Sequence, residues 1–548
     1  MVVLKVNKDR LKNLTGIDLD KIEYVLESLA VDIKRDDQES WDLELYPDRP
    51  DLYSIFGLSR SIRQFIFMEE KSYKIKKSGI DLIVDPNMKK VRPFIGAAAI
   101  KNISFKNEDI KDIMDLQEKL HLSLGRNRKK IAIGIHDLDK VLPPFRYAAE
   151  KPDRISFVPL GFDIEMNLLE IIKNHPKGIE YGDIIKNFET FPVILDSNNN
   201  VLSFPPIING KLTQVTEKTK NIFIDVTGTD LFTVINALNI TVTALNEISG
   251  NIESVNVIYP DGTMILPDLG YEKVKFNKDM IEDVIGIKLS DDEIHNSLKS
   301  MGYKSIIRKN VVEARVPPYR IDVMHPVDII EDIVKVFGYN NIPRSRPNKF
   351  SMAEESNVEI VKERFRKIMI GFGYMEIINL IFTSKERNFY NFDISDEYSP
   401  KMVNPIIEDQ YIYRTWLFPM LMETLRNNKH RDLPQKIFEI GEVFSKKETI
   451  HLACAEISSN ASFTEIKGLV GKLFKSIGKE LNFIDGKNPF LIDGRQADIL
   501  INNEKAGFFG EVHPGIIEKF DLGNPVIAFE IDIEKLFQDI FNSRLNFG

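Results

Sequence analysis

Cysteine is almost absent from this chain of 548 residues, which contains a single one, Cys454. One thiol can form neither an internal disulfide framework nor a cysteine-rich metal site, so we expect a reducing environment. The sequence also lacks any run of about 18 apolar residues, the length that a helix needs to cross a bilayer. Its first residues, MVVLKVNKDR, hold too short an apolar run for a signal peptide. These absences predict a cytoplasmic protein without membrane contact.

Common nucleotide-binding and catalytic motifs are missing as well. The sequence has no HExxH pair, no Cys/His cluster and no nucleophile elbow. The segment GLVGK at 468–472 is too short for a P-loop, and Gly371 and Gly373 lack the third glycine of a dinucleotide fingerprint. We therefore take these glycines as turn or packing residues.

Length and charge set the broad class of the protein. The length predicts about three to five domains, and prolines and glycines at turn spacing predict linkers near 258–272 and 344–357. The net charge of -9 argues against nucleic-acid binding over the whole surface, because phosphate contacts need clustered Lys and Arg. A local basic strip stays compatible with this charge.

Two stretches of the chain repeat one another. LKVNKD at 4–9 matches VKFNKD at 274–279, and PDRPD at 47–51 shares its Pro, Arg and Asp with PYRID at 318–322. The offset changes only from 270 to 271 between the two matches, which indicates a duplicated module. Small modules of this kind bind nucleic acid or another protein, and the sequence leaves both open.

The second copy carries acidic residues that the first copy lacks. Asp328, Glu331 and Asp332 stand at i, i+3 and i+4 of an expected helix, so they share one face, and Asp322 approaches from the preceding loop. We expect the four carboxylates to converge, and an all-oxygen set suits Mg2+. The alternative is that acids in a first helical turn only complement the helix dipole.

The run PPYRIDVMHPVDIIEDIVKVFGYNNIP at 317–343 resembles a signature of the phenylalanine–tRNA ligase beta subunit in its archaeal and eukaryotic form. The resemblance covers essentially the whole chain and implies a multidomain α+β fold. Its domains would be a helix and β-ribbon module at 1–75, an α/β editing domain of the B3/B4 type at 80–255, the repeated module of the B5 type at 268–346, and a catalytically inactive class II synthetase-like domain at 355–548.

The resemblance also implies partners and a cofactor. The expected assembly is an α2β2 tetramer that attaches phenylalanine to tRNA(Phe), with ATP and phenylalanine bound by the alpha subunit. This chain would supply contacts with the alpha subunit and with tRNA. The acids Asp322, Asp328, Glu331 and Asp332 would be Mg2+ ligands at the contact with the alpha subunit.

Residues 80–255 would hydrolyse tRNA(Phe) that carries tyrosine. A synthetic site for phenylalanine has limited power to exclude an analogue with one extra hydroxyl, so a second, polar pocket must recognise that hydroxyl and cut the ester. The candidates are Ser203, Asp225 and Thr227 in the pocket and Leu195 as a wall, with Arg126, Arg128 and His136 to hold the tRNA end or orient a water.

Each candidate also has a structural interpretation. Asp225 and Thr227 can form a local side-chain-to-backbone turn. His136 can be a structural histidine, and the basic run RNRKK at 126–130 can be a solvated surface.

Residues 355–548 alternate strands with helices, which predicts an α+β domain around a largely antiparallel sheet. The order resembles a class II synthetase domain, whose active members hold phosphates with arginines. Here the strand KIFE at 436–439 lacks the expected arginine, and no arginine occurs between Arg495 and Arg544. We therefore expect no adenylation by this chain.

A segment of the same domain could contact the alpha subunit or belong to the core. Its residues are Arg414, Trp416, Phe418, Met420 and Leu421. Two other functions stay open: a non-catalytic RNA or protein scaffold without editing, and a self-sufficient synthetase with an unusual phosphate site.

Overall fold

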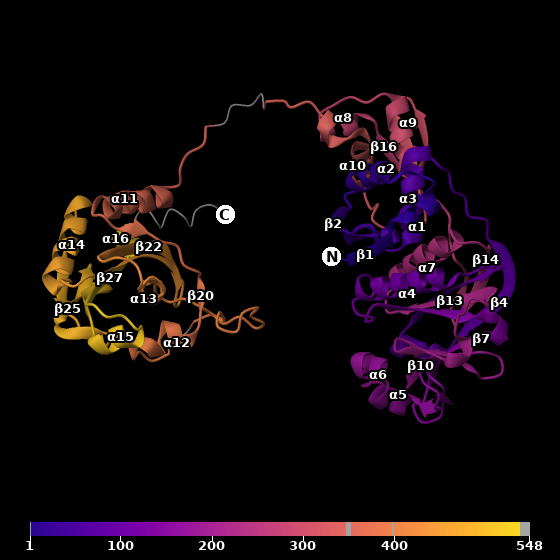
Figure 1. The fold of residues 1–548 in the computed structure, drawn as a ribbon, viewed down its shortest axis with the longest axis horizontal. Coiled ribbons are helices and arrows are strands. Elements are labelled where there is room, and N and C mark those ends of the chain that lie inside the picture. The colour runs from indigo at the N-terminus through magenta and orange to yellow at the C-terminus, as the bar shows by residue number, and fades with distance from the viewer. Residues whose placement is uncertain (1, 347–351, 397–398, 538–548) are drawn as a thin grey trace. The chain divides into compact units, whose positions relative to one another are not determined.

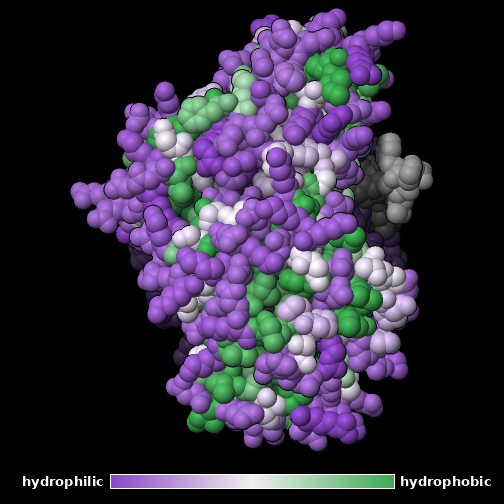
Figure 2. All heavy atoms as spheres, turned by 90° about the vertical axis from the view of Figure 1, so that its right-hand side faces the viewer, coloured by the Kyte–Doolittle hydropathy of each residue, from purple (hydrophilic) through white to green (hydrophobic). Residues whose placement is uncertain are grey.

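The computed structural model describes residues 2–346, 352–396 and 399–537. The chain forms two compact units, Met1–Arg346 and Pro347–Gly548 (Figure 1). Part of the expected linker at 344–357, residues 347–351, lies outside the described residues. No described helix is long and apolar enough to pass through a bilayer, and the face shown in Figure 2 carries mostly hydrophilic side chains.

The first module of unit 1 is a small sheet covered by helices. Its strands pair in the order β1-β3-β2, and the apolar side chains Leu4 and Val6 of β1 alternate into the core. Asn7 caps the first helix by accepting from the Arg10 amide. The elements are β1 (Val2–Asn7), α1 (Lys8–Thr15), α2 (Leu19–Ser28), β2 (Asp32–Asp36), β3 (Ser40–Leu45) and α3 (Ile55–Phe67).

The second module has the same plan. Its strands pair in the order β16-β18-β17, so strand order as well as sequence supports a duplication. The two modules contact one another: the Tyr319 hydroxyl bonds to the Gln64 amide at 2.9 Å, and the Arg60 guanidinium lies 3.6 Å from the Tyr319 ring centre. The elements are β16 (Glu272–Asn277), α8 (Asp279–Ile285), α9 (Asp291–Ser300), β17 (Lys304–Arg308), β18 (Val311–Val316) and α10 (Pro326–Phe337).

The part of the sequence between the modules forms a ten-stranded mixed sheet, in the order β12-β11-β10-β7-β4-β14-β5-β13-β6 with β15 paired to β14. Strand β4 runs parallel to β14 and β7, and the other pairings are antiparallel. The β14–β15 hairpin takes up residues 258–266 of the segment expected as a linker, so only residues 267–271 connect the sheet to the second module. The strands are β4 (Lys76–Val84), β5 (Phe94–Lys101), β6 (Ile131–Asp137), β7 (Phe145–Glu150), β10 (Phe191–Leu195), β11 (Val201–Phe204), β12 (Ile208–Asn209), β13 (Asn221–Gly228), β14 (Asn251–Tyr259) and β15 (Gly262–Leu266).

Helices pack on this sheet at two places. Helices α4 (Asn107–Leu122) and α7 (Leu231–Asn246) lie against strands β5, β6 and β13. Helices α5 (Leu168–Asn174) and α6 (Pro176–Tyr181) belong to a separate apolar cluster with β10 and β11. A short ribbon, β8 (Ser156–Phe157) and β9 (Met166–Asn167), lies between these parts in the sequence.

Unit 2 is built on a seven-stranded sheet, in the order β19-β22-β23-β27-β26-β25-β24. All pairings are antiparallel except β19 with β22. Apolar clusters lie on both faces, one with α11 and α14 and the other with α13. The elements are α11 (Asn357–Gly371), β19 (Met375–Glu376), β20 (Phe382–Thr383), α12 (Lys385–Asn388), β21 (Ile412–Tyr413), α13 (Phe418–Asn427), β22 (Gln435–Phe444), β23 (Glu448–Ile457), α14 (Phe463–Ser476), β24 (Asn482–Asp485), β25 (Leu491–Ile501), β26 (Glu504–Val512), α15 (Pro514–Lys519), β27 (Val526–Asp532) and α16 (Ile533–Leu536).

Candidate functional site

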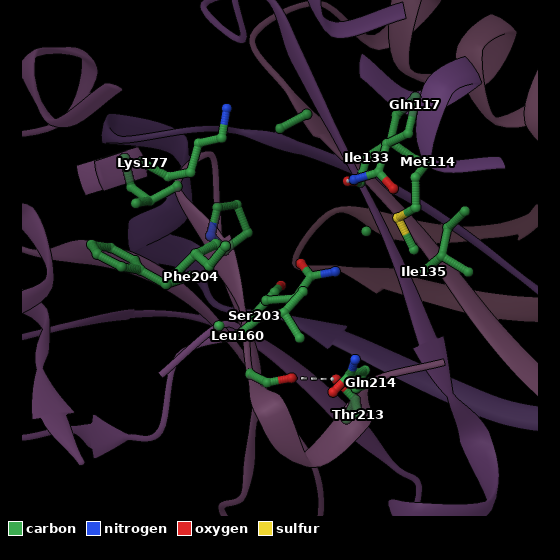
Figure 3. Close-up of a pocket in the computed structure, with 18 of the residues that line it drawn as sticks. Met114, Gln117, Ile133, Ile135, Leu160, Lys177, Ser203, Phe204, Thr213 and Gln214 are labelled. Atoms are coloured by element: carbon green, nitrogen blue, oxygen red, sulfur yellow. Dashed lines mark hydrogen bonds between the residues drawn. The ribbon is translucent and has the colours of Figure 1, made fainter. Parts of the chain in front are cut away.

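A cavity of about 640 Å³ opens in the large sheet domain of unit 1. Its walls come from α4, β6, β13 and the segment that follows β11. Figure 3 shows the side chains around it, with Gln117 and Met114 from α4 on one side and Phe204 and Lys177 on another. Of the residues expected in an editing pocket, Ser203, Asp225 and Arg128 line this cavity.

His136 and Asp225 form a buried pair at the cavity wall. Their strands β6 and β13 are antiparallel neighbours, and the His136 Nε2 and Asp225 Oδ2 atoms are 2.7 Å apart. On the other side of the ring, His136 Nδ1 lies 2.8 Å from the Thr213 hydroxyl. A Cβ atom on Gly134 would lie only 2.2 Å from Asp225 Oδ2, so glycine at 134 leaves room for the pair.

This geometry orients one proton of the pair. A carboxylate only accepts, so the His136 Nε2–H donates to Asp225. The Thr213 hydroxyl lies beside His136 Nδ1 and also within 3.3 and 3.4 Å of the Gly210 and Leu202 carbonyls. Such a chain holds a carboxylate in place beside the cavity. No sequence motif identifies Thr213. It lies 77 residues from His136 in the chain, and only the fold brings it to the pair.

Ser203 lies on β11, and its hydroxyl is buried without a hydrogen-bond partner among the described residues. Leu195 is buried in the apolar cluster that contains α5 and α6, and it is not one of the residues that line the cavity. The structure therefore brings Ser203 to the cavity and places Leu195 behind it.

Thr227 is held by an arginine that the sequence analysis missed. Arg92 donates from Nε to the Thr227 hydroxyl at 3.0 Å and from Nη2 to its carbonyl at 2.9 Å. Arg92 is fully buried and has no carboxylate within ion-pair distance among the described residues. Burial lowers the pKa of Arg92 to about 10. Thr227 is fully buried as well and lies outside the cavity lining.

The two arginines of the basic run at 126–130 differ in burial. Arg126 is exposed, as a tRNA contact requires. Arg128 is buried, and its guanidinium donates to Glu118 at 2.6 Å and to the Ile207 carbonyl at 2.8 Å. Arg128 therefore ties α4 to the segment after β11, and its charge is already balanced by a carboxylate.

The four acids of the second module do not meet at one point. Arg320 donates to Asp322 through Nε and Nη2, at 2.9 and 2.6 Å, and the same Nη2 lies 2.6 Å from Asp332 Oδ2. The Tyr303 hydroxyl also donates to Asp332 at 2.6 Å. The charge of Arg320 outweighs the effect of burial and lowers the pKa of Asp322.

The other two acids have separate roles. Asp328 accepts from the Met324 and His325 amides, at 2.8 and 2.7 Å, and so caps the start of α10. Glu331 is exposed and pairs with Lys335 one turn later at 2.9 Å. Within the described ranges no group of three or more His, Cys, Asp or Glu side chains is placed to hold a metal ion. The expected convergence is not found, and the capping alternative applies to Asp328.

In unit 2 the segment KIFE ends with Glu439, a buried carboxylate that forms an ion pair with Arg414. Glu439 on β22 accepts from Arg414 Nη1 at 2.6 Å and from the Asn379 amide at 2.8 Å. Both members of this ion pair are 2% exposed. Arg414 is thus paired with a carboxylate of the same chain.

The segment expected at the alpha-subunit contact is largely core. Phe418 and Leu421 are fully buried in the cluster around α13, and Arg414 is buried with Glu439. Trp416 and Met420 are half-buried. The core alternative therefore holds for most of this segment.

Comparisons with known proteins agree on one family. The model described as "Phenylalanyl tRNA synthetase beta chain CLM domain" matches residues 342–533, "tRNA synthetase B5 domain" matches 274–339 and "B3/4 domain" matches 81–246. The chain is similar to the phenylalanine–tRNA ligase beta subunit of Methanosarcina barkeri, with 42% identity over 98% of this chain and 99% of the relative. For the Archaeoglobus fulgidus protein of the same name the identity is 38%, over 98% and 99% of the two chains.

A solved structure gives the same result. An N-terminal fragment of the phenylalanyl-tRNA synthetase beta subunit from Pyrococcus horikoshii aligns with a TM-score of 0.60 and 37% identity. The alignment covers 62% of this chain and all of the fragment. The resemblance drawn from the sequence is confirmed.

Proposed function

This chain belongs to the phenylalanine–tRNA ligase beta-subunit family, and we propose that it serves an α2β2 ligase by removing tyrosine from mischarged tRNA(Phe) in the cavity beside α4. The alpha subunit binds ATP and phenylalanine in this proposal. The beta chain supplies alpha-subunit contacts, tRNA contacts and the hydrolytic site.

One observation carries the editing proposal. Thr213, His136 and Asp225 form a buried row of hydrogen-bonded side chains at the wall of a cavity large enough for an aminoacyl group. Hydrolysis of an ester needs a base that takes a proton from water while the water attacks the carbonyl carbon. Asp225 is held by His136 for that role. The ester C–O bond then breaks, and the ribose oxygen leaves with a proton.

Ser203 supports the same proposal. Its hydroxyl lines the cavity and has no partner among the described residues, so it is available to donate to an oxygen of the substrate. Arg126 is exposed near the basic run and fits a contact with the tRNA backbone. Thr227 and Leu195 act behind the surface, and Arg128 is part of the cavity wall, where it ties α4 to the segment after β11.

The first experiment measures hydrolysis of Tyr-tRNA(Phe) by the alpha–beta complex, with wild type compared with Asp225→Ala. We expect the variant to lose about 100-fold to 10,000-fold in rate, the usual contribution of a general base, while synthesis of Phe-tRNA(Phe) persists. Asp153→Ala is the matched control, because Asp153 is an exposed carboxylate of the same domain.

Two results would contradict the proposal. Unchanged hydrolysis in Asp225→Ala would remove this residue from the site. A wild-type complex that never clears Tyr-tRNA(Phe) would favour the alternative function, an RNA and protein scaffold without chemistry.

The proposed contact with the alpha subunit has support in unit 2. Several large apolar side chains around the β20–β21 pair are exposed, with Ile378 at 91%, Val403 at 92% and Ile406 at 97%. Apolar groups that gather at a surface mark protein interfaces. Ile378→Glu should weaken co-purification with the alpha subunit, whereas Ile370→Glu on α11, which is also exposed, should not.

Magnesium does not fit the four acids as the structure arranges them. Asp322 and Asp332 are bound to Arg320, Asp328 caps a helix and Glu331 pairs with Lys335. No step of the proposed reaction therefore passes through a metal on this chain. The role of these acids as Mg2+ ligands stays a prediction.

A further inference from the structure

The turn that connects α4 to β6 has an unusual backbone. Arg126, Asn127 and Arg128 follow one another with φ angles of 47°, 55° and 63°, so all three lie in the left-handed region. Residues other than glycine visit this region as single residues, because their Cβ atom crowds the following carbonyl oxygen. A run of three must be held in place by its surroundings, and strain of this kind is concentrated where proteins bind or react.

Main-chain hydrogen bonds close the turn at both ends. The Arg128 amide donates to the His121 carbonyl at 3.1 Å, and the Lys130 amide donates to the Gly125 carbonyl at 2.8 Å. Beyond the turn, the Thr229 amide donates to the Lys130 carbonyl at 3.0 Å. These bonds fix the ends of the turn and leave the carbonyls in its middle to another partner.

Arg92 is that partner. Its Nη2 donates to the Arg128 carbonyl at 3.3 Å, and its Nη1 donates to the Lys129 carbonyl at 3.4 Å. The same guanidinium also donates to the hydroxyl and the carbonyl of Thr227, and the Tyr147 hydroxyl donates to the Arg92 carbonyl at 3.0 Å. Several donors in one plane allow a single arginine to join β13 to the turn.

The environment of Arg92 is costly for a cation. The side chain is 2% exposed, and the oxygens that it reaches belong to carbonyls and a hydroxyl. A buried charge lowers stability unless hydrogen bonds compensate for the lost water. A buried cation that directs half of these donors to one strained turn indicates that the shape of the turn is needed for function.

The turn presents cationic side chains beside the cavity. Arg126, Asn127 and Lys129 are exposed, whereas Arg128 between them is buried and lines the cavity. Two cations on a fixed loop match the phosphates of a polynucleotide, which carry a regular row of negative charges. A preformed loop also avoids the entropy that a mobile loop loses when it binds.

We propose that Arg92 is a positioning residue for tRNA, which preforms the left-handed turn at 126–128 so that Arg126 and Lys129 contact phosphates of the acceptor end. This inference rests on the proposed editing function and adds a residue that touches neither the tRNA nor the ester. Arg92 acts through the shape of the turn. Loss of that shape should therefore weaken substrate binding and leave the chemical step unchanged.

The test changes the shape of the turn and leaves its charges in place. Valine hardly adopts the left-handed conformation, whereas glycine adopts it freely. In the alpha–beta complex we expect Asn127→Val to raise the KM for hydrolysis of Tyr-tRNA(Phe) by about tenfold, because the loop must then be ordered on binding. The kcat should stay at the wild-type value. Asn127→Gly removes the same side chain and should keep the wild-type KM.

Asn187→Val is the matched control, because Asn187 is exposed in the same domain and lies outside the left-handed region. Its KM should equal that of wild type. A wild-type KM in Asn127→Val would overturn the proposal. An equal rise of KM in Asn127→Val and Asn127→Gly would also overturn it, since the amide side chain, and not the shape of the turn, would then contact the tRNA.

Arg92→Met removes the donors that hold the turn, and we expect the same rise of KM. A fall of kcat with an unchanged KM would show that Arg92 supports only the cavity wall, which overturns its role at the turn. The contacts themselves are tested by salt. Arg126→Gln and Lys129→Gln should each lower the slope of log KM against log salt by about 1, and unchanged slopes in both would exclude the phosphate contacts.

Binding of deacylated tRNA(Phe) separates this proposal from the proposed function. If the wild-type complex never hydrolyses Tyr-tRNA(Phe), the editing proposal fails, and the Kd of deacylated tRNA(Phe) then tests the turn. This Kd should rise in Asn127→Val and stay unchanged in Asn187→Val; an unchanged Kd in both overturns the proposal. If wild type hydrolyses Tyr-tRNA(Phe) while Asn127→Val keeps the wild-type KM and Kd, editing stands and the role of the turn is overturned.

Discussion

The two copies of the duplicated module place an arginine in the same position and neutralise it differently. In the first copy Arg49 forms a two-point ion pair with Asp51, at 2.8 and 2.9 Å. In the second copy Arg320 does the same with Asp322. Both loops have the Pro-x-Arg-x-Asp pattern, so the ion pair follows from local sequence.

The copies differ at the helix that follows. Arg49 Nη2 also reaches the Ser61 hydroxyl, at 3.4 Å, whereas Arg320 Nη2 reaches the Asp332 carboxylate at 2.6 Å. Both residues stand 12 positions after their arginine. The second arginine therefore compensates two carboxylates, and the first compensates one.

Two further pairs of matched positions also differ in charge, with an acid in the second copy and none in the first. Glu331 corresponds to Arg60, which is buried against Tyr319 of the other copy and lies 3.5 Å from Asp51. Asp328 corresponds to Gly57, where a Cβ atom would lie 1.8 Å from the Asp51 carbonyl. The first copy has no room for a capping acid there. The same arginine–aspartate pair therefore stands in two different charge patterns, and Arg60 of the first copy packs on Tyr319 of the second.

The largest effect should come from Arg320→Met. The change leaves Asp322 and Asp332 buried without their cation, which costs about 3–5 kcal/mol of unfolding free energy for a broken buried ion pair. The measurement is urea unfolding in a Trp416→Phe background, where Trp41, buried in β3, is the remaining tryptophan and reports on unit 1. A loss below about 1 kcal/mol would contradict the charge assignment.

Arg49→Met should cost less, about 2–3 kcal/mol. Only one carboxylate, Asp51, loses its partner, and Arg60 remains beside it. The same fluorescence assay applies. A larger loss of unfolding free energy in Arg49→Met than in Arg320→Met would show that the additional carboxylate, Asp332 in place of Ser61, does not set the size of the effect.

The acid side of the stability curve should depend on Asp322. Its folded pKa lies below the ordinary value of about 3.9 because Arg320 stabilises the charged form. The stability that it contributes is present above that pH and is lost as the pH falls through the lower folded pKa. Unfolding curves of wild type should therefore weaken below about pH 4, and those of Asp322→Asn should weaken less. Parallel curves for the two proteins would rule this out.

The smallest effect should be that of magnesium. Arg320 and Lys335 already neutralise three of the four acids, so chelation with EDTA should leave the Tm of the chain unchanged. A rise in Tm with added Mg2+ that disappears in Asp328→Asn would instead support the metal site expected from the sequence.

Sequence patterns predicted the elements that depend on local order. The helix expected to carry Asp328, Glu331 and Asp332 is α10, and the strands expected after residue 355 form a largely antiparallel sheet. The linker expected at 258–272 is shorter than predicted, because its first Pro and Gly form the turn of the β14–β15 hairpin and only residues 267–271 connect to the second module.

Contacts between distant residues could not be predicted in this way. Thr213 meets His136 across 77 residues and Arg92 meets Thr227 across 135. Neither pair belongs to a motif with fixed spacing, so only the fold brings them together.

The sequence by itself determined the family and the duplication, and it marked Asp225, Ser203 and the four acids of the second copy as candidates. Only the tertiary structure decided what those side chains face. Arg320 stands between two of the acids, and Thr213 meets His136 at the wall of the cavity. The physical reason is that a charged or polar group takes the nearest partner in space, and that partner is set by the packing of strands and helices far apart in the chain.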